Sequence, residues 1–145
     1  MAAPAPAREH FAHFVTIATR WSDNDQYGHI NNVVYYSYFD TAVNHHLIDA
    51  GVLDPASSPV IGVVVDTQCS FRQPLSFPDQ LDIGLRVSKL GTRSVTYQLG
   101  VFRAGAPEPA AFGRFVHVYV ERVQFTPVAI PAPVRRALEP LYQAP

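Results

Sequence analysis

The side chains best suited to chemistry are concentrated in one short stretch, residues 22–32, which precedes the only long segment with helical spacing. Two carboxylates, one imidazole and two carboxamides lie there: Asp23, Asp25, His29, Asn31 and Asn32. Such a position puts ionisable groups beside a helix N-terminus, which carries partial positive charge and free N–H donors. The arrangement suits an activated carboxylate that faces a developing oxyanion better than it suits an ordinary surface turn.

The sequence does not match the other known motifs that could explain this stretch. The run from Asp23 to Gly28 begins like a calcium loop, but Val34 occupies the twelfth position, where a bidentate Glu is required. No Gly-x-Ser-x-Gly elbow, phosphate-binding loop or dinucleotide fingerprint is present in the sequence. The single cysteine, Cys69, lies inside a predicted strand, and no Cys/His spacing resembles a zinc site. We therefore expect neither a metal nor a cofactor.

Length and composition predict one globular domain over residues 1–145, with residues 1–10 as a flexible, Ala/Pro-rich tail. The chain is 48% hydrophobic and 16% charged, which is enough apolar material for a genuine core. Its formal net charge is −1 and its basic residues are scattered, which argues against a nucleic-acid partner. The start has no basic segment followed by an apolar run, so we expect a cytoplasmic protein without a membrane anchor.

Alternation of apolar and polar residues predicts five strands, over residues 14–21, 63–72, 81–88, 94–101 and 115–123. A helix is predicted from Asn31 or Asn32 to about Ala50, where Gly51 supplies a C-terminal stop. The first half of this helix is apolar almost all round, which indicates burial. One polar stripe interrupts it and needs water, a ligand or a partner: Ser37, Asp40, Thr41 and Asn44. A short amphipathic helix is expected near residues 133–141.

This order of elements predicts an α+β protein in which a curled antiparallel sheet of about five strands wraps around one long central helix. A small curled sheet has exposed edges that invite pairing with a second copy. In addition, the long strand at residues 63–72 has one polar face, on which Asp66 and Arg72 lie. A partner subunit could supply hydrogen bonds to these polar groups. We expect a homodimer, or a tetramer assembled from such dimers.

The sequence resembles the signature of hotdog-fold acyl thioesterases of the 4-hydroxybenzoyl-CoA thioesterase type, also recognisable in plant acyl-ACP thioesterases. The matching pattern is Arg20-x-Ser22-Asp23-x-Asp25-x-x-Gly28-His29-x-Asn31-Asn32-x-x-Tyr35-x-x-Tyr38-Phe39-Asp40. Weaker agreement extends from about Phe14 to Leu138. The resemblance implies the hotdog fold, which the alternation of residues suggests independently.

The resemblance also implies hydrolysis of an acyl thioester. Asp25 matches the catalytic carboxylate and would act as nucleophile or general base, while a backbone N–H around Asn32 would polarise the thioester carbonyl at a site between two subunits. His29 would orient these groups or contact the substrate. One loop-to-helix junction would hold carboxylate and donor in fixed relation. Tyr27 departs from the plant enzymes, which have a functional Asn there, so their Asn/His scheme does not transfer whole.

Five further residues are candidates for substrate binding. Tyr35 is first of all a core residue but could line an acyl pocket. Asp40 either closes the network at the helix N-terminus or acts in the site. Arg72, Arg93 and Ser94 are candidates to bind the phosphates or the pantetheine arm of coenzyme A, since Arg suits phosphate oxygens, although a solvated surface is the better-favoured explanation for them.

The leading interpretation is therefore an acyl-CoA thioesterase, and three alternatives stay open. A non-catalytic acyl-binding protein would not need Asp25, which is present. An acyl-ACP thioesterase would need a basic surface for its acidic carrier, and none is evident in the sequence. A hotdog dehydratase or hydratase usually has an Asp/His pair, whereas the Asn31-Asn32 helix entry resembles thioesterases. The sequence does not indicate the acyl group or its chain length.

Overall fold

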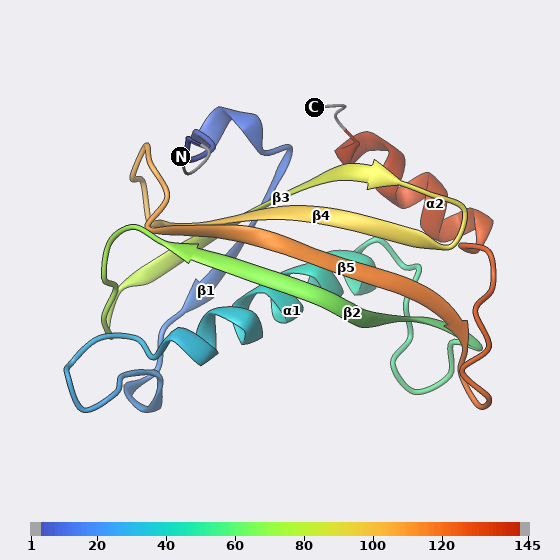
Figure 1. Cartoon of the computed structure of the whole chain (residues 1–145), viewed down its shortest axis with the longest axis horizontal. Helices are drawn as coiled ribbons and strands as arrows, with labels where there is room; N and C mark the ends of the chain where they lie inside the picture. The colour runs from blue at the N-terminus through green and yellow to red at the C-terminus, as the bar shows by residue number, and fades with distance from the viewer. Residues whose placement is uncertain (1–3, 143–145) are drawn as a thin grey trace.

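The structure is a computed structural model and describes residues 4–142 of the chain (Figure 1). Two α-helices and five strands form its framework: β1 (His13–Ala18), α1 (Asn32–Asp49), β2 (Val60–Phe71), β3 (Gln80–Leu90), β4 (Ser94–Arg103), β5 (Ala111–Glu121) and α2 (Ala132–Leu138). Short 3-10 turns lie at Arg8–His10, Trp21–Asp23 and Glu139–Leu141.

The five strands form one antiparallel sheet in the order β1-β3-β4-β5-β2. This sheet curls over α1, and α2 lies at the end of the sheet where β3 turns into β4 (Figure 1). The predicted α+β architecture with a five-stranded curled sheet is thus confirmed. The helix that it covers has 18 residues, which corresponds to about 27 Å at 1.5 Å per residue.

Strict alternation in β3 and β4 builds the core beneath the sheet. Each strand sends four side chains inward, all with no exposed surface: Leu81, Ile83, Leu85, Val87, Val95, Tyr97, Leu99 and Val101. They pack against apolar residues of α1, among them Phe39 and Val43, which are also fully buried. Burial of each such aliphatic side chain is worth roughly 1.5–3 kcal/mol. Packing therefore positions α1, and with it the loop at the start of the helix.

Both ends of α1 lie where the sequence predicts them. The side chain of Asn31 caps the helix by accepting a hydrogen bond from the Val33 amide at 3.1 Å. At the other end Gly51 adopts a φ of 75°, in the left-handed region that terminates helices. The position of the helix start matters for function because its free N–H groups face the polar loop.

The strand β2 differs from the prediction in one respect. A bulge between Val64 and Asp66 shifts the pairing register with β5, so that Val63 shares a face with Asp66 and not with Thr67. The continuous alternation predicted across residues 63–72 is wrong at this point, because one extra residue in a strand inverts the facing of every residue beyond it. After the bulge, Asp66, Gln68 and Ser70 lie on the face opposite α1, whereas Thr67 and Cys69 share the face of the buried Phe115.

The described part of the chain before β1 packs on that opposite face of the sheet. Arg8 pairs with Asp82 at 3.0 Å and its Nε donates to the Ala106 carbonyl at 2.8 Å. Phe11 lies over Gly84 and Gly100, where an added Cβ would come within 3 Å of its ring. The predicted flexible tail, residues 1–10, is therefore held at its end by Arg8, while Met1 to Ala3 lie outside the described residues.

The predicted C-terminal helix forms as α2 followed by the 3-10 turn Glu139–Leu141. Its residues Val134 and Leu138 are buried and join the main core. Among the helices in residues 4–142, none combines the length and the apolar character needed to cross a membrane.

Candidate active site

A buried carboxylate organises the polar loop between β1 and α1. Asp23 is 1% exposed; its Oδ2 accepts hydrogen bonds from the Tyr38 hydroxyl at 2.8 Å and the Arg20 amide at 2.9 Å. Its Oδ1 lies 2.9 Å from Nη2 of Arg20. Burial alone would raise the pKa of Asp23, but these donors and the guanidinium charge together hold the pKa below its usual range. Asp23 therefore stays ionised and ties the loop to α1.

A second segment, residues 75–79, clamps the same loop from the other side. The Asn24 side chain donates to Ser76 Oγ at 3.2 Å and accepts from the Phe77 amide at 3.0 Å. Ser76 Oγ in turn donates to the Gly28 carbonyl at 2.8 Å. These contacts fix the loop backbone on both sides of Asp25. The sequence had offered no signal for the role of Ser76.

Asp25 lies in an Asx turn at the centre of this clamped loop. Its Oδ1 accepts a hydrogen bond from the Tyr27 amide at 2.9 Å, and its own N–H donates to the His29 carbonyl at 2.8 Å. Gly28 closes the turn with a φ of 83°, a conformation that favours glycine. The other carboxylate oxygen, Oδ2, has no hydrogen-bond donor within residues 4–142. One oxygen thus holds the turn, while the second remains available to a substrate or a water molecule.

Asp25 lines a surface hollow of about 250 Å³ together with Trp21, Asn24, Gln26 and Gly28. Trp21 is 81% exposed, so an indole ring stands beside the carboxylate with little cover. Neither Trp21 nor Gln26 was among the site residues predicted from sequence. Their position in the loop was the only available signal, because both residue types are common at surfaces.

A neighbouring hollow of about 320 Å³ opens at the N-terminus of α1. Four predicted site residues line it: His29, Asn32, Tyr35 and Arg72. Phe71, the last residue of β2, also forms part of its wall. Asn32 is the first helical residue, and its backbone N–H has no acceptor within residues 4–142. Burial raises the pKa of Tyr35 to about 12, so its hydroxyl stays protonated. The hollow therefore offers a free N–H, an imidazole and a guanidinium.

Adjacent residues line the two hollows, Gly28 the first and His29 the second. Asp25 therefore lies in the same loop as His29, which lines the second hollow together with Asn32, Tyr35 and Arg72. Asp40 is different: it is exposed on α1, where its Oδ1 accepts from Asn44 at 3.1 Å, and it lines neither hollow.

Arg93 and Ser94 lie in the hairpin between β3 and β4, whereas the polar loop adjoins the start of β3 through the Thr19 amide and the Asp79 carbonyl. These two predicted residues and Asp25 therefore stand at opposite ends of β3.

The described residues offer little support for a cysteine nucleophile or a metal centre. Burial raises the pKa of the Cys69 thiol to about 12, which leaves it protonated and poorly nucleophilic. Within residues 4–142, no three His, Cys, Asp or Glu side chains gather closely enough to hold a metal ion. The arrangement instead combines an ionisable carboxylate with a helix N–H, as acyl transfer to water requires.

Comparison with known proteins decides the family. A model of the thioesterase-like superfamily matches residues 19–138. This range includes the polar loop, both α-helices and the strands β2 to β5, and it begins just after β1. The chain belongs to the thioesterase-like superfamily. For this superfamily member, hydrolysis of a thioester is the general activity that the match supports, and the superfamily's hotdog fold agrees with the sheet and helix described above.

Individual relatives agree with that assignment. The PA5185 protein from Pseudomonas aeruginosa is 52% identical, with a TM-score of 0.95 over 98% of this chain and 100% of that one. BH1999 gentisyl-coenzyme A thioesterase is 25% identical, with a TM-score of 0.76 over 87% of this chain and 99% of that one. A chloroplastic acyl-acyl carrier protein thioesterase from Arabidopsis thaliana is 24% identical over 85% of this chain and 65% of its own length.

Proposed function

We propose that this superfamily member is an acyl-CoA thioesterase in which Asp25 is the catalytic carboxylate and the Asn32 N–H polarises the thioester carbonyl. The observation that carries this proposal is the clamped junction between loop and helix. It presents a carboxylate oxygen and a helix N–H, both without partners within residues 4–142, on one short, hydrogen-bonded segment. Such preorganisation lowers the cost of aligning the reacting groups.

The chemistry follows from these two groups. As general base, Asp25 would accept a proton from water while the water oxygen attacks the thioester carbonyl carbon. The negative charge that develops on the carbonyl oxygen would be stabilised by the Asn32 N–H, a contribution on the order of 10²–10³ in rate. Collapse of the intermediate breaks the C–S bond, and the thiolate takes the proton back from Asp25. As nucleophile, Asp25 would instead attack the carbonyl carbon, break the C–S bond and release the thiolate, forming a mixed anhydride that water then hydrolyses to the free acid and the Asp25 carboxylate.

We also propose that two copies complete the site. The strand β2 is at the edge of the sheet, and Val64, Val65 and Phe71 along it are between 44% and 58% exposed. Antiparallel pairing of β2 with the same strand of a two-fold-related copy would cover this edge. The same pairing would place Arg93 and Ser94 of one protomer beside the polar loop of its partner. Their distance from Asp25 within one chain is then no obstacle to a role in substrate binding.

Thiol release from a panel of short, medium, long and aromatic acyl-CoAs tests the proposed activity. We expect release above the spontaneous rate for at least one class, with an acid and free coenzyme A as the products. If no acyl-CoA is hydrolysed by folded protein at any chain length, the acyl-CoA thioesterase proposal is wrong.

The Arabidopsis relative favours a second candidate, an acyl-ACP thioesterase. The same acyl groups should then be presented on acyl carrier protein in a parallel series. Hydrolysis of the carrier-protein series alone would select this candidate. Binding of acyl chains without hydrolysis of either series would instead indicate a non-catalytic acyl-binding protein.

A further inference from the structure

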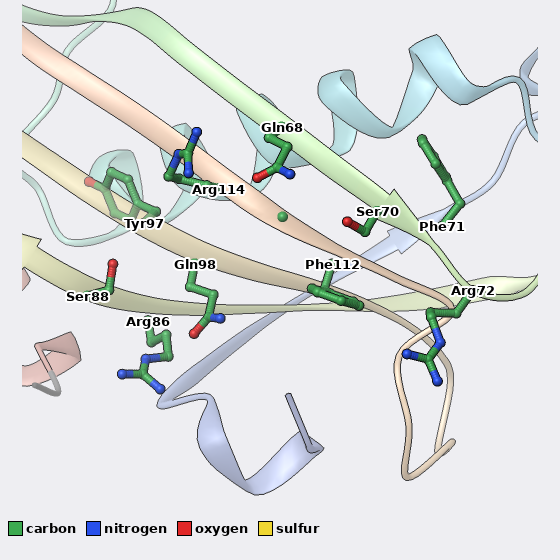
Figure 2. A pocket seen from close by; sticks show the side chains of 11 residues that line it. Gln68, Ser70, Phe71, Arg72, Arg86, Ser88, Tyr97, Gln98, Phe112 and Arg114 are labelled. Carbon is green, nitrogen blue, oxygen red and sulfur yellow. The ribbon is translucent and has the colours of Figure 1, made fainter. Parts of the chain in front are cut away.

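A hollow of about 710 Å³ lies on the face of the sheet opposite α1 (Figure 2). Four of its residues form a row across four adjacent strands, because Gln68 pairs with Arg114, Arg114 with Gln98, and Gln98 with Arg86. Register partners share one face of a sheet, and Tyr97 and Leu99, the neighbours of Gln98, point inward to the core. We call this hollow the outer groove.

Three guanidinium groups line the outer groove. Arg72, Arg86 and Arg114 line it and none of its lining residues is acidic. Arg114 does pair with Asp66 at 2.9 Å, but both side chains are about half exposed, so this ion pair is readily shared with a ligand. The planar guanidinium group is suited to bidentate contacts with phosphate oxygens. The groove therefore favours an anion with several charges.

Aromatic and amide groups extend this chemistry beyond phosphate. Phe112 lines the groove close to the row of Arg and Gln side chains (Figure 2). Its ring offers a surface for stacking of a flat base, while Gln68 and Gln98 each provide both a donor and an acceptor. The volume of the groove falls within the range of about 300–1,000 Å³ that small-molecule sites occupy. A phosphorylated nucleotide meets all of these features.

The outer groove adjoins the hollow at the N-terminus of α1. Phe71 and Arg72 line both the groove and the hollow that contains Asn32 and Tyr35. A molecule whose thioester lies at Asn32 can thus pass over the end of β2 and continue into the groove. Only a substrate with a long arm and a charged end would use both regions.

We propose that the outer groove binds the 3′-phosphorylated adenosine diphosphate end of coenzyme A, with its phosphates at Arg72 and Arg114 and its adenine against Phe112. This inference rests on the proposed function, because it takes the thioester to lie at Asn32. It also specifies the carrier. A phosphopantetheine arm on acyl carrier protein has one phosphate and no nucleotide, so it would leave most of the groove empty.

Binding of adenosine 3′,5′-bisphosphate tests the groove without any chemistry at the thioester. Calorimetric titration of the natural protein should show saturable binding that weakens with added salt. The variant Arg114→Gln should bind about tenfold more weakly or worse, since it loses a charge-assisted contact. Arg136→Gln is the matched control, because Arg136 is exposed on α2 and lines no part of the groove. Absence of binding to the natural protein would overturn the proposal, whatever its activity.

A kinetic comparison then separates the groove from the catalytic centre. The same acyl group is presented on coenzyme A and on N-acetylcysteamine, which lacks the nucleotide. Arg114→Gln should lower the ratio of kcat/KM for the two substrates about tenfold, mainly through KM for the acyl-CoA, while Arg136→Gln keeps the ratio of the natural protein.

An equal loss on both substrates would indicate general damage and refute the groove assignment. If adenosine 3′,5′-bisphosphate binds at the groove but neither thioester is hydrolysed, the proposed function fails and the nucleotide site stands. If both thioesters are hydrolysed and Arg114→Gln leaves the ratio of their kcat/KM values unchanged, the groove assignment fails and the proposed function stands.

Discussion

His117 is a core histidine that makes the stability of the protein depend on pH. It is 1% exposed on β5, its Nδ1 has no hydrogen-bond partner within residues 4–142, and it is surrounded by the rings of Tyr97, Phe115 and Tyr119. Burial lowers the pKa of His117 from 6.5 to about 4. The neutral imidazole is therefore the form that the fold accepts.

This pKa shift predicts a loss of stability in mild acid. Below pH 6.5 the unfolded chain binds a proton at His117 that the folded chain does not, so the free energy of unfolding falls as the pH drops toward 4. At pH 5 the expected loss from this residue is about 2 kcal/mol. Urea denaturation at pH 7 and pH 5 should show this loss, and His117→Gln should remove it while keeping the smaller losses due to carboxylates such as Asp23. An identical pH dependence in the two proteins would contradict the assignment.

At the level of elements, the polar loop and α1 act as one unit because of the contact between Asp23 and Tyr38. This hydrogen bond joins a loop carboxylate to the second turn of the helix at 2.8 Å. Tyr38 is 5% exposed, and its burial, followed by the neighbouring Asp23 carboxylate, raises the pKa of its hydroxyl. Asp25 and Asn32 lie between these two residues in the sequence. Their relative position therefore depends on this contact.

Removal of the Tyr38 hydroxyl should affect stability and catalysis together. We expect Tyr38→Phe to lower the free energy of unfolding by about 1.5–3 kcal/mol, since a buried carboxylate loses one donor. We also expect kcat to fall more than tenfold with little change in KM, because the loop loses its alignment and keeps its binding surfaces. Tyr36→Phe, on the same helix without such a contact, is the control. A stable variant with natural kcat would show that the contact is dispensable.

Much of this element-level arrangement follows from the sequence. Alternation of residues in β3 and β4 predicts their buried faces, and Asn31 and Gly51 mark the ends of α1. The bulge in β2 could not be predicted, because Val63, Val64 and Val65 are equally apolar and leave the pairing register undetermined until β5 packs beside them.

The candidate site is predictable only in part, for a related reason. The sequence indicates Asp25, His29 and Asn32 as neighbours because one short loop contains them. The clamp by Ser76 and the wall formed by Phe71 depend on contacts between segments about 40–50 residues apart, and no local pattern predicts such pairings. The outer groove is likewise a product of the sheet register, since its four central residues come from four strands.

For the whole molecule, the exposed edge of β2 leads to a prediction about assembly. We expect a mass in solution of at least twice the 16.0 kDa of the chain, because pairing of β2 with a second copy covers the exposed Val64 and Val65. Val64→Lys should shift the protein toward monomer in light scattering and lower its activity in parallel, since each site would lose its partner. Ala104→Lys adds the same charge in the exposed turn after β4 and should leave the mass unchanged. A natural protein that is monomeric would contradict this prediction.

The central claim is that Asp25 supplies the catalytic carboxylate, and the most direct test is kcat/KM of Asp25→Asn for the best acyl-CoA of the panel. Asparagine retains an oxygen for the Tyr27 amide, so the Asx turn is preserved while the ionisable group is lost. We expect kcat/KM to fall by about 10²–10⁴ at an unchanged folded fraction, with Asp49→Asn, an exposed residue at the end of α1, as the control. Full activity in folded Asp25→Asn would contradict the account.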